Sequence, residues 1–311
     1  MAEQRPSVQE MIANAGTKRN RKTLEKTIPV VLFIIAAISV LTTLGIVFTL
    51  IVETFIFFTE VPFFSFLFGT EWLPFSNTEA RFGILPLIVG TLKVTFIAVI
   101  VAVPLGLSAA IYLSEYASDT ARRIIKPILE VLAGVPTIVY GYFALTFVTP
   151  VLQQFIPELK IFNAISPGIV VGIMIIPMIA SLSEDAMSAV PNSIREGALG
   201  MGSTRLEVAL KIVLPAALSG ILASIVLAMS RAIGETMIVS LAAGSTPRFD
   251  GQFTDSIQTM TAYIVQVATG DAGYGTTIYY SIYAVGFTLF LFTLVMNLLA
   301  QRISKRFREE Y

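Results

Sequence analysis

The chain has 311 residues and no net formal charge; 55% of its residues are hydrophobic and only 14% are charged. Soluble domains carry about 25% charged residues, and a mean hydropathy of +0.79 is that of an integral membrane protein. Cysteine and histidine are both absent, which excludes disulfides, zinc–thiolate sites and histidine-based acid–base catalysis. No catalytic residue and no metal site is therefore predicted.

Apolar segments long enough to cross a bilayer, which takes about 20 apolar residues each, recur along the sequence. In chain order the predicted spans are residues 28–58, 82–113, 127–150, 166–182, 212–243 and 276–300. The predicted fold class is all-α: a polytopic membrane protein with six transmembrane helices. Gly and Pro inside spans, at Gly134, Pro136, Gly141 and Pro177, mark positions where a helix can break or kink.

The segments between the spans complete the predicted organisation. Residues 1–27 form a cytoplasmic N-terminal tail, residues 28–58 an additional first transmembrane helix, and residues 59–81 an extracytoplasmic loop whose aromatics favour the membrane interface. Residues 82–300 form a five-helix core with a cytoplasmic loop at 191–215, and residues 301–311 a cytoplasmic tail. The Gly-, Thr- and Asp-rich segment 244–275 is expected to be an outer loop.

The positive charges fix the expected orientation. The segments predicted to be cytoplasmic hold Arg5, Lys18, Arg19, Arg21, Lys22, Lys26, Arg122, Arg123, Lys126, Arg195, Arg205, Lys211, Arg302, Lys305, Arg306 and Arg308. The opposite side holds only Arg81, Lys160 and Arg248. Because Lys and Arg accumulate in cytoplasmic loops, both termini and the 191–215 loop are predicted to be cytoplasmic.

The 191–215 loop reads PNSIREGALGMGSTRLEVALKIVLP. Each charged side chain in it would cost about 2.5–3.5 kcal/mol at a bilayer centre, so the loop must lie in water or against a partner. Asn192 or Ser193 is placed to cap a helix whose first turn holds Glu196. Gly202 permits a turn, and the last proline of the loop stands where a new helix can start.

Arg231 and Glu235 lie about midway along the fifth predicted span, where ionisable side chains face a bundle interior or a water path. Four residues apart, they share one helix face and can pair. Two interpretations stay open: a pair that only neutralises itself, or a translocation pathway in which the guanidinium fork of Arg231 attracts an anion and Glu235 tunes it. Glu130, in the third predicted span, is a weaker pathway candidate.

The 191–215 loop also contains Gly197-x4-Gly202-Ser203-Thr204, which superficially resembles a phosphate-binding loop. The lysine before Ser/Thr is missing and no strand precedes it. No cofactor is therefore expected in this chain, which is not expected to be an enzyme.

The loop's spacing resembles the cytoplasmic "EAA" loop of ABC-importer permeases. The matching positions are Glu196, Gly197, Ala198, Gly202, Ile212, Leu214 and Pro215, with Gly197 in place of the first alanine of the triplet. The resemblance implies that these residues form a helix-turn-helix that docks in a groove of the ATPase subunit and couples the two proteins.

Longer strings are similar to those of the phosphate ABC-importer permease of the PstC type. They are ILPLIVGTLKVT (84–95), LEVLAGVPTIVYG (129–141), IIPMIASLSEDAMSAVP (175–191) and SRAIGETMIVSLAAG (230–244). The similarity runs from about residue 82 to the C-terminus. It implies the type I ABC-importer permease fold in the plasma (inner) membrane of a prokaryote, with Arg231, Glu235 and Glu130 as pathway residues.

The same resemblance implies a set of partners. They are a second, PstA-like permease in a heterodimer, two ATPase subunits, an extracytoplasmic phosphate-binding protein, phosphate itself and membrane lipid, but no nucleic acid. The implied mechanism is alternating access, in which closure of the ATPases pulls the 191–215 loop and rocks the five core helices.

Other function classes stay open from the sequence. A permease for another oxyanion, sulfate or molybdate, would have the same loop, and only the Arg231–Glu235 phrase argues against it. An ATP-independent transporter or channel would need no ATPase partner. A membrane-embedded enzyme would have to use Asp, Glu, Ser or Lys, and none of these clusters suggestively.

Overall fold

The structure is a computed structural model that describes residues 18–76, 79–270 and 272–306, and the chain divides into two units, residues 1–52 and 53–311. Within the described residues, five helical segments are long and apolar enough to cross a membrane, and a bent helix pair supplies a sixth candidate. The all-α prediction is confirmed.

The helices follow in chain order as α2 (Lys18–Glu60), α3 (Phe63–Phe68), α4 (Leu85–Ile111), η2 (Tyr112–Tyr116), α5 (Asp119–Gly134), α6 (Thr137–Phe143), η3 (Ala144–Val148), α7 (Thr149–Phe155), α8 (Ile165–Ser188), α9 (Asn192–Gly200), α10 (Arg205–Val208), η4 (Ala209–Val213), α11 (Leu214–Ala216), α12 (Leu218–Ile233), α13 (Met237–Ala242), α14 (Met260–Ala268) and α15 (Thr277–Arg306). The η elements are single π-helical stretches. Two short antiparallel strands, β1 (Trp72–Leu73) and β2 (Arg81–Phe82), pair Trp72 with Phe82.

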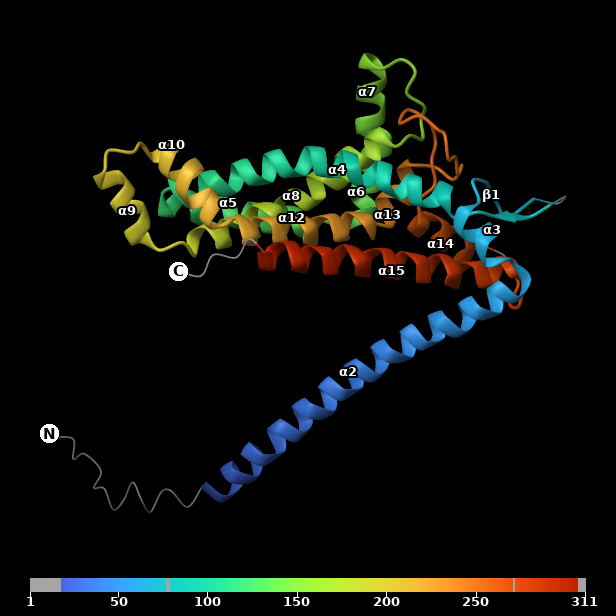
Figure 1. Ribbon diagram of the computed structural model, residues 1–311, viewed down its shortest axis with the longest axis horizontal. Helices are drawn as coiled ribbons and strands as arrows, with labels where there is room; N and C mark the ends of the chain where they lie inside the picture. Colours follow the sequence, from blue (N-terminus) through green and yellow to red (C-terminus); the bar gives the residue numbers. More distant parts are fainter. Residues whose placement is uncertain (1–17, 77–78, 271, 307–311) are drawn as a thin grey trace, which may run out of the picture. The chain divides into compact units, whose positions relative to one another are not determined.

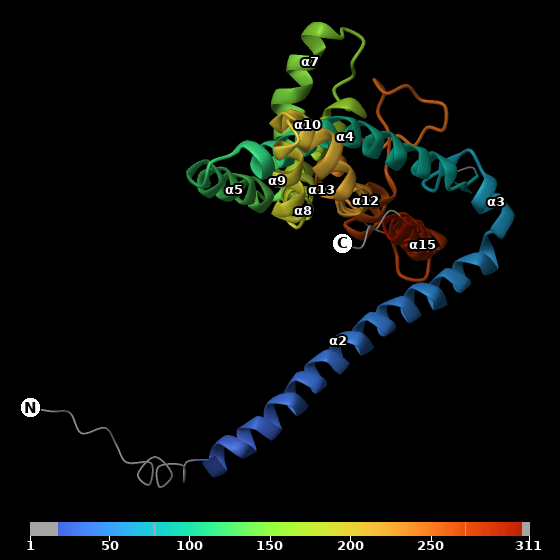
Figure 2. The same ribbon diagram turned by 60° about the vertical axis from the view of Figure 1, so that its left-hand side comes forward.

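In the second unit the long helices α4, α8, α12 and α15 run side by side (Figures 1 and 2). The helices α9 and α10 lie at one end of this bundle, and α3 and β1 lie at the other (Figure 1). Hydroxyl and amide side chains join the helices inside: Ser183 of α8 pairs with Ser224 of α12 at 2.8 Å, and Ser230 of α12 donates to Asn297 of α15 at 2.7 Å. Such polar contacts hold helices together where lipid removes the hydrophobic drive for association.

The closest helix pair, α4 and α8, depends on small residues. A Cβ on Gly172 would lie 2.9 Å from the carbonyl oxygen of Ala98, and one on Gly168 would lie 2.7 Å from the Ile97 side chain. Small residues let two backbones approach closely inside a membrane. The Gly168-x3-Gly172 face of α8 therefore sets the separation of these two helices.

Gly90, near the start of α4, gives a sharp test of this packing. A Cβ there would lie 2.2 Å from the backbone carbonyl oxygen of Gln258, and the next residue, Thr91, accepts a hydrogen bond from the Met260 N–H. We expect Gly90→Ala to lower the melting temperature by several degrees, because overpacking costs about 1–3 kcal/mol. Gly45→Ala, where nothing lies within 4 Å, is the control and should leave thermal unfolding unchanged.

Trp72 was expected at the membrane interface, and that expectation is wrong. The indole is only 1% exposed and packs edge-on against Tyr263 of α14, with ring centroids 4.8 Å apart, and against Phe82 at 5.8 Å. Pairing of β1 with β2 turns the ring inward. The chain from α3 to β2 therefore forms an aromatic cap on the end of the bundle that holds α14.

Some predicted boundaries differ from the structure. The third candidate span is Thr137–Phe155 rather than 127–150, because the chain breaks at Val135–Pro136 and the preceding residues form the separate amphipathic helix α5. The fifth span is interrupted at 234–236, between α12 and α13. Segment 244–275 is not all loop, because it contains α14.

Candidate functional site

The 191–215 loop is a helix-turn-helix. Helix α9 ends at Gly200, the chain turns through Gly202, and α10 leads through η4 into α11. Gly202 has φ +93°, a conformation that costs other residues energy because of their Cβ atom. Pro215 stands in the first turn of α11, where its missing N–H is tolerated.

The expected N-terminal cap of α9 is wrong, because Pro191 precedes the first helical residue, Asn192, and no side-chain cap forms. The second helix is capped instead. The Thr204 hydroxyl accepts from the Glu207 N–H at 3.3 Å, and the Glu207 carboxylate accepts from the Thr204 N–H at 3.0 Å. This capping box fixes where the chain re-enters a helix after the turn.

The capping box makes a pH prediction. The hydrogen bond from the Thr204 backbone, followed by that from the Lys211 ammonium, lowers the pKa of Glu207 from 4.5 to about 2. A depressed carboxyl pKa stabilises the fold at pH values above 4.5, and this contribution disappears as the pH falls from 4.5 towards 2. A ¹³C-carboxyl NMR titration should show this low pKa, with Glu207→Gln assigning the signal, and Lys211→Met, which removes the ammonium donor, should move the pKa back towards 4.5.

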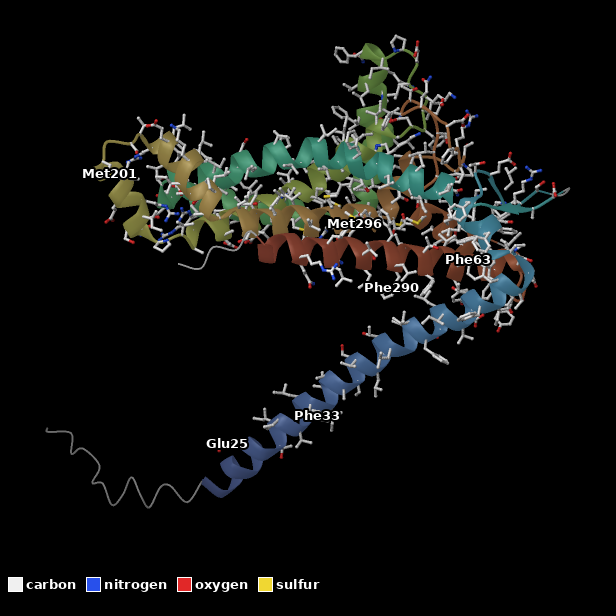
Figure 3. All side chains as sticks on the ribbon, in the orientation of Figure 1. Glu25, Phe33, Phe63, Met201, Phe290 and Met296 are labelled. Atoms are coloured by element: carbon white, nitrogen blue, oxygen red, sulfur yellow. The ribbon has the colours of Figure 1, made fainter. Side chains whose placement is uncertain are left out.

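One side of the loop packs on the bundle and the other faces outward. Ala198, Val208 and Val213 are buried in a cluster with residues of α4, α8 and α12. Glu196 and Gly197 are exposed, and Met201, at the turn, is 84% exposed (Figure 3). The loop therefore has a fixed base and a free outer face, as a docking element requires.

Arg195 ties α9 to the end of α4. Its guanidinium lies 3.2 Å from the Glu115 carboxylate of η2 and donates to the carbonyls of Val190 and, at 2.7 Å, Met187. Both charged side chains are largely buried. A buried ion pair with several hydrogen bonds holds its partners in one geometry, so movement of α9 is transmitted to the end of α4.

A second ionic contact holds α5 against α8. Glu184 of α8 is 2% exposed, and its carboxylate lies 2.5 Å from the Lys126 ammonium and 3.8 Å from the Arg122 guanidinium. Arg122 also donates to the carbonyl of Leu113 at 2.7 Å. Three elements, η2, α5 and α8, are thus held together beside the loop.

The sequence interpretation counted Arg122 and Lys126 only as markers of orientation and did not assign Glu184 a role. The available signal was their spacing of four residues, which puts both cations on one face of a helix. Glu130, a predicted pathway residue, lies on the same helix α5 and is exposed, and within the described residues it forms no ion pair.

Arg231 and Glu235 do not pair in the structure. The helix ends at Ile233, so the two side chains no longer share a face. Glu235 is 8% exposed and its carboxylate accepts from the N–H groups of Met237 and Ile238, at 3.1 and 3.2 Å. Arg231 is exposed at the end of α12, and no carboxylate of the described residues lies within 4.0 Å. An unpaired guanidinium at the end of an apolar helix faces water or protein rather than lipid.

One helix, α12, connects the end of the 191–215 loop to Arg231. The segment Arg205–Ala216 meets α12 at a bend of 72°, and α12 then runs without interruption to Arg231. The structure therefore places the exposed loop and the exposed guanidinium at opposite ends of the same helix.

Comparison with known sequences identifies relatives of this chain. Residues 102–309 match the family described as binding-protein-dependent transport system inner membrane component. The chain is 32% identical to the probable ABC transporter permease protein YqgH of Bacillus subtilis, over 78% of this chain and 77% of that protein. It is 34% identical to the phosphate transport system permease protein PstC of Mesorhizobium japonicum, over 78% and 79% of the two chains.

Solved structures share the fold. A chain of a bacterial alginate ABC transporter, in complex with an alginate-bound periplasmic protein, matches with a TM-score of 0.63 at 16% identity, over 89% of this chain and 94% of that one. A chain of the inward-facing MetNI methionine ABC transporter matches with a TM-score of 0.55 at 16% identity, over 73% and 98%. The fold is that of type I ABC-importer permeases, and this chain belongs to the family of binding-protein-dependent transport system inner membrane components.

Proposed function

We propose that the chain is the transmembrane permease subunit of an ATP-driven importer of inorganic phosphate. The observation that carries the proposal is the exposed helix-turn-helix at 191–215, which continues into α12, the helix whose last turn holds Arg231. The relatives named as phosphate permeases support phosphate as the cargo. ATP and Mg²⁺ are bound by the partner ATPase.

The outer face of the 191–215 loop is the proposed ATPase contact. Glu196 and Gly197 are exposed there, whereas Ala198, Ile212 and Leu214 belong to the cluster that seats the loop on the bundle. Gly202 and Pro215 shape the turn and the return to α12. Two ATPase subunits would engage this loop and its counterpart on a second, PstA-like permease, and both termini would lie on the ATPase side.

Arg231 is the proposed anion contact in the pathway. Its guanidinium is exposed and unpaired among the described residues, and the buried Glu235 stabilises the start of α13 just beyond it. Phosphate, delivered by an extracytoplasmic binding protein, would be attracted by Arg231 through charge-assisted hydrogen bonds. Glu130 is retained as a further lining candidate.

Reconstitution tests the proposal. The chain is co-purified with its second permease and ATPases, placed in vesicles, and assayed for ATP-dependent uptake of phosphate, sulfate and molybdate in the presence of the binding protein. We expect uptake of phosphate alone. Uptake of sulfate or molybdate instead would assign another oxyanion, and uptake by the isolated chain without ATP would refute the ATPase-driven mechanism.

Replacement of Arg231 tests the pathway assignment. We expect Arg231→Ala to reduce phosphate uptake at least about tenfold, since a hydrogen bond to a charged group is worth about 1.5–3 kcal/mol, and Arg231→Lys to retain part of the rate. Because no carboxylate in the described chain depends on Arg231, folding should be unaffected. Wild-type uptake by Arg231→Ala would remove Arg231 from the pathway.

A further inference from the structure

A polar cavity of about 480 Å³ lies between the 191–215 loop and the bundle. Its lining comes from η2, α5, the end of α8, α9 and α10. Three arginines line it: Arg122 of α5, Arg195 of α9 and Arg205 of α10. Glu115 is the lining carboxylate, and Ser114, Ser188 and Asn192 add hydroxyl and amide groups. Blue nitrogen atoms gather at this end of the bundle, near α5 and α9 (Figure 3).

The charges of the cavity do not balance. Glu115 is already engaged by Arg195 at 3.2 Å. Glu184, which lies outside the lining, is 3.8 Å from Arg122 but 2.5 Å from Lys126, so Lys126 supplies its main counter-charge. Within the described residues Arg205 has no carboxylate within 4.0 Å. A concave site with an excess of positive charge concentrates anions.

The chemistry of the lining selects one kind of anion. Guanidinium groups match the oxygen atoms of phosphate with paired N–H donors, and the side-chain amide of Asn192 can donate to an oxygen that remains. The hydroxyls of Ser114 and Ser188 already donate to Glu115 and Glu184. We propose that this cavity binds a phosphate-class anion, either inorganic phosphate or the phosphate of an anionic lipid headgroup. The proposal concerns this cavity alone and stands whichever solute the transporter carries.

The position of the cavity gives binding a consequence. Arg195 is already held by Glu115 and by the carbonyls of Val190 and Met187. An anion would therefore bind between Arg122 of α5 and Arg205 of α10 and bridge these two elements beside α9. The hydrogen bonds between the anion and these arginines exist only while the 191–215 loop packs on the bundle. The bound anion would therefore hold the 191–215 loop in place.

The absence of cysteine from the sequence makes a direct test possible. The full-length chain carrying Leu199→Cys, a cavity-lining position that is 44% exposed, is placed in nanodiscs of neutral phosphatidylcholine. The rate of maleimide alkylation is measured with inorganic phosphate and with chloride of equal ionic strength. A second set of nanodiscs contains phosphatidylglycerol and no phosphate.

Phosphate should slow alkylation several-fold in neutral nanodiscs if the ligand is soluble, and phosphatidylglycerol alone should slow it if the ligand is a headgroup. Arg205→Gln should raise the half-protecting concentration about tenfold, because a charged hydrogen bond is lost. Lys211→Gln, which alters a loop cation outside the cavity, and Arg231→Ala, which alters the pathway, should both keep the protection. The last control separates this site from the transport pathway.

The proposal is overturned if phosphate and phosphatidylglycerol protect no better than chloride, or if Arg205→Gln is protected as well as its parent. A second measurement uses the chain without the introduced cysteine, so that the result does not depend on the folding of the Leu199→Cys variant. Phosphate or phosphatidylglycerol should raise the melting temperature of the unmodified chain by mass action, and by less in Arg205→Gln. Equal shifts in both chains would also refute the site.

Discussion

Glu196→Lys is expected to abolish phosphate uptake while the chain still inserts into the membrane. Glu196 lies on the outer face of α9, exposed and without an ion-pair partner among the described residues. Its proposed partner is a cation in the groove of the ATPase. Reversal of the charge at a docked pair costs several kcal/mol, which corresponds to an association at least about 100-fold weaker. Uptake of labelled phosphate by cells and ATPase co-purification would measure the loss.

A graded series separates lost docking from lost folding. Glu196→Gln removes the charge without reversing it and should keep part of the uptake. Because nothing in the described chain packs against this carboxylate, both variants should reach the membrane at the parental level, as an immunoblot of membranes would show. Normal uptake by Glu196→Lys would mean that this face of α9 does not couple the chain to an ATPase.

Lys126→Met is expected to be the most destabilising of the single charge removals near the loop. It would leave Glu184, 2% exposed, with the 3.8 Å contact to Arg122 and a hydrogen bond from the Ser188 hydroxyl at 3.2 Å. A buried charge without its partner costs about 3–5 kcal/mol, and we expect the lower end of that range because Arg122 remains. Equilibrium unfolding in mixed detergent micelles would measure the difference.

Two comparisons isolate the cause. Lys211→Met breaks an exposed pair with Glu207 and should cost less than about 1 kcal/mol. The double variant Lys126→Met/Glu184→Met replaces both charges with apolar groups and should recover most of the stability lost in Lys126→Met. If the double variant is no more stable than the single one, the Lys126–Glu184 contact does not account for the loss.

The sequence predicted the features that follow from composition and local chemistry. Long apolar runs predicted the candidate spans in α2, α4, α8 and α15, with each end placed within about six residues, because bilayer thickness sets the length of a span. The turn at Gly202 was also predictable, since few other residues accept its φ. The spacing around Glu196 led to the family that the comparisons confirm.

Features that depend on tertiary packing could not be predicted from the sequence. Gly134 and Pro136 marked a possible break, but the sequence did not show that residues 119–134 form a helix outside the third span. That helix is held by packing of Lys126 and Arg122 on Glu184. The break after Ile233 removed the expected Arg231–Glu235 pair, because Glu235 caps α13 instead. Trp72 is buried because it packs against Tyr263 of α14, a helix within the segment 244–275 that was predicted to be a loop.

Helix α12 packs against α8 and connects the 191–215 loop to Arg231. The helix has 16 residues, so it is about 24 Å long, and a tilt of about 10° would move its far end by about 4 Å. That distance exceeds the reach of a hydrogen bond. In the proposed mechanism, a small tilt of α12 where it meets the 191–215 loop would therefore move the Arg231 guanidinium towards an anion or away from it, without any change in the helix itself.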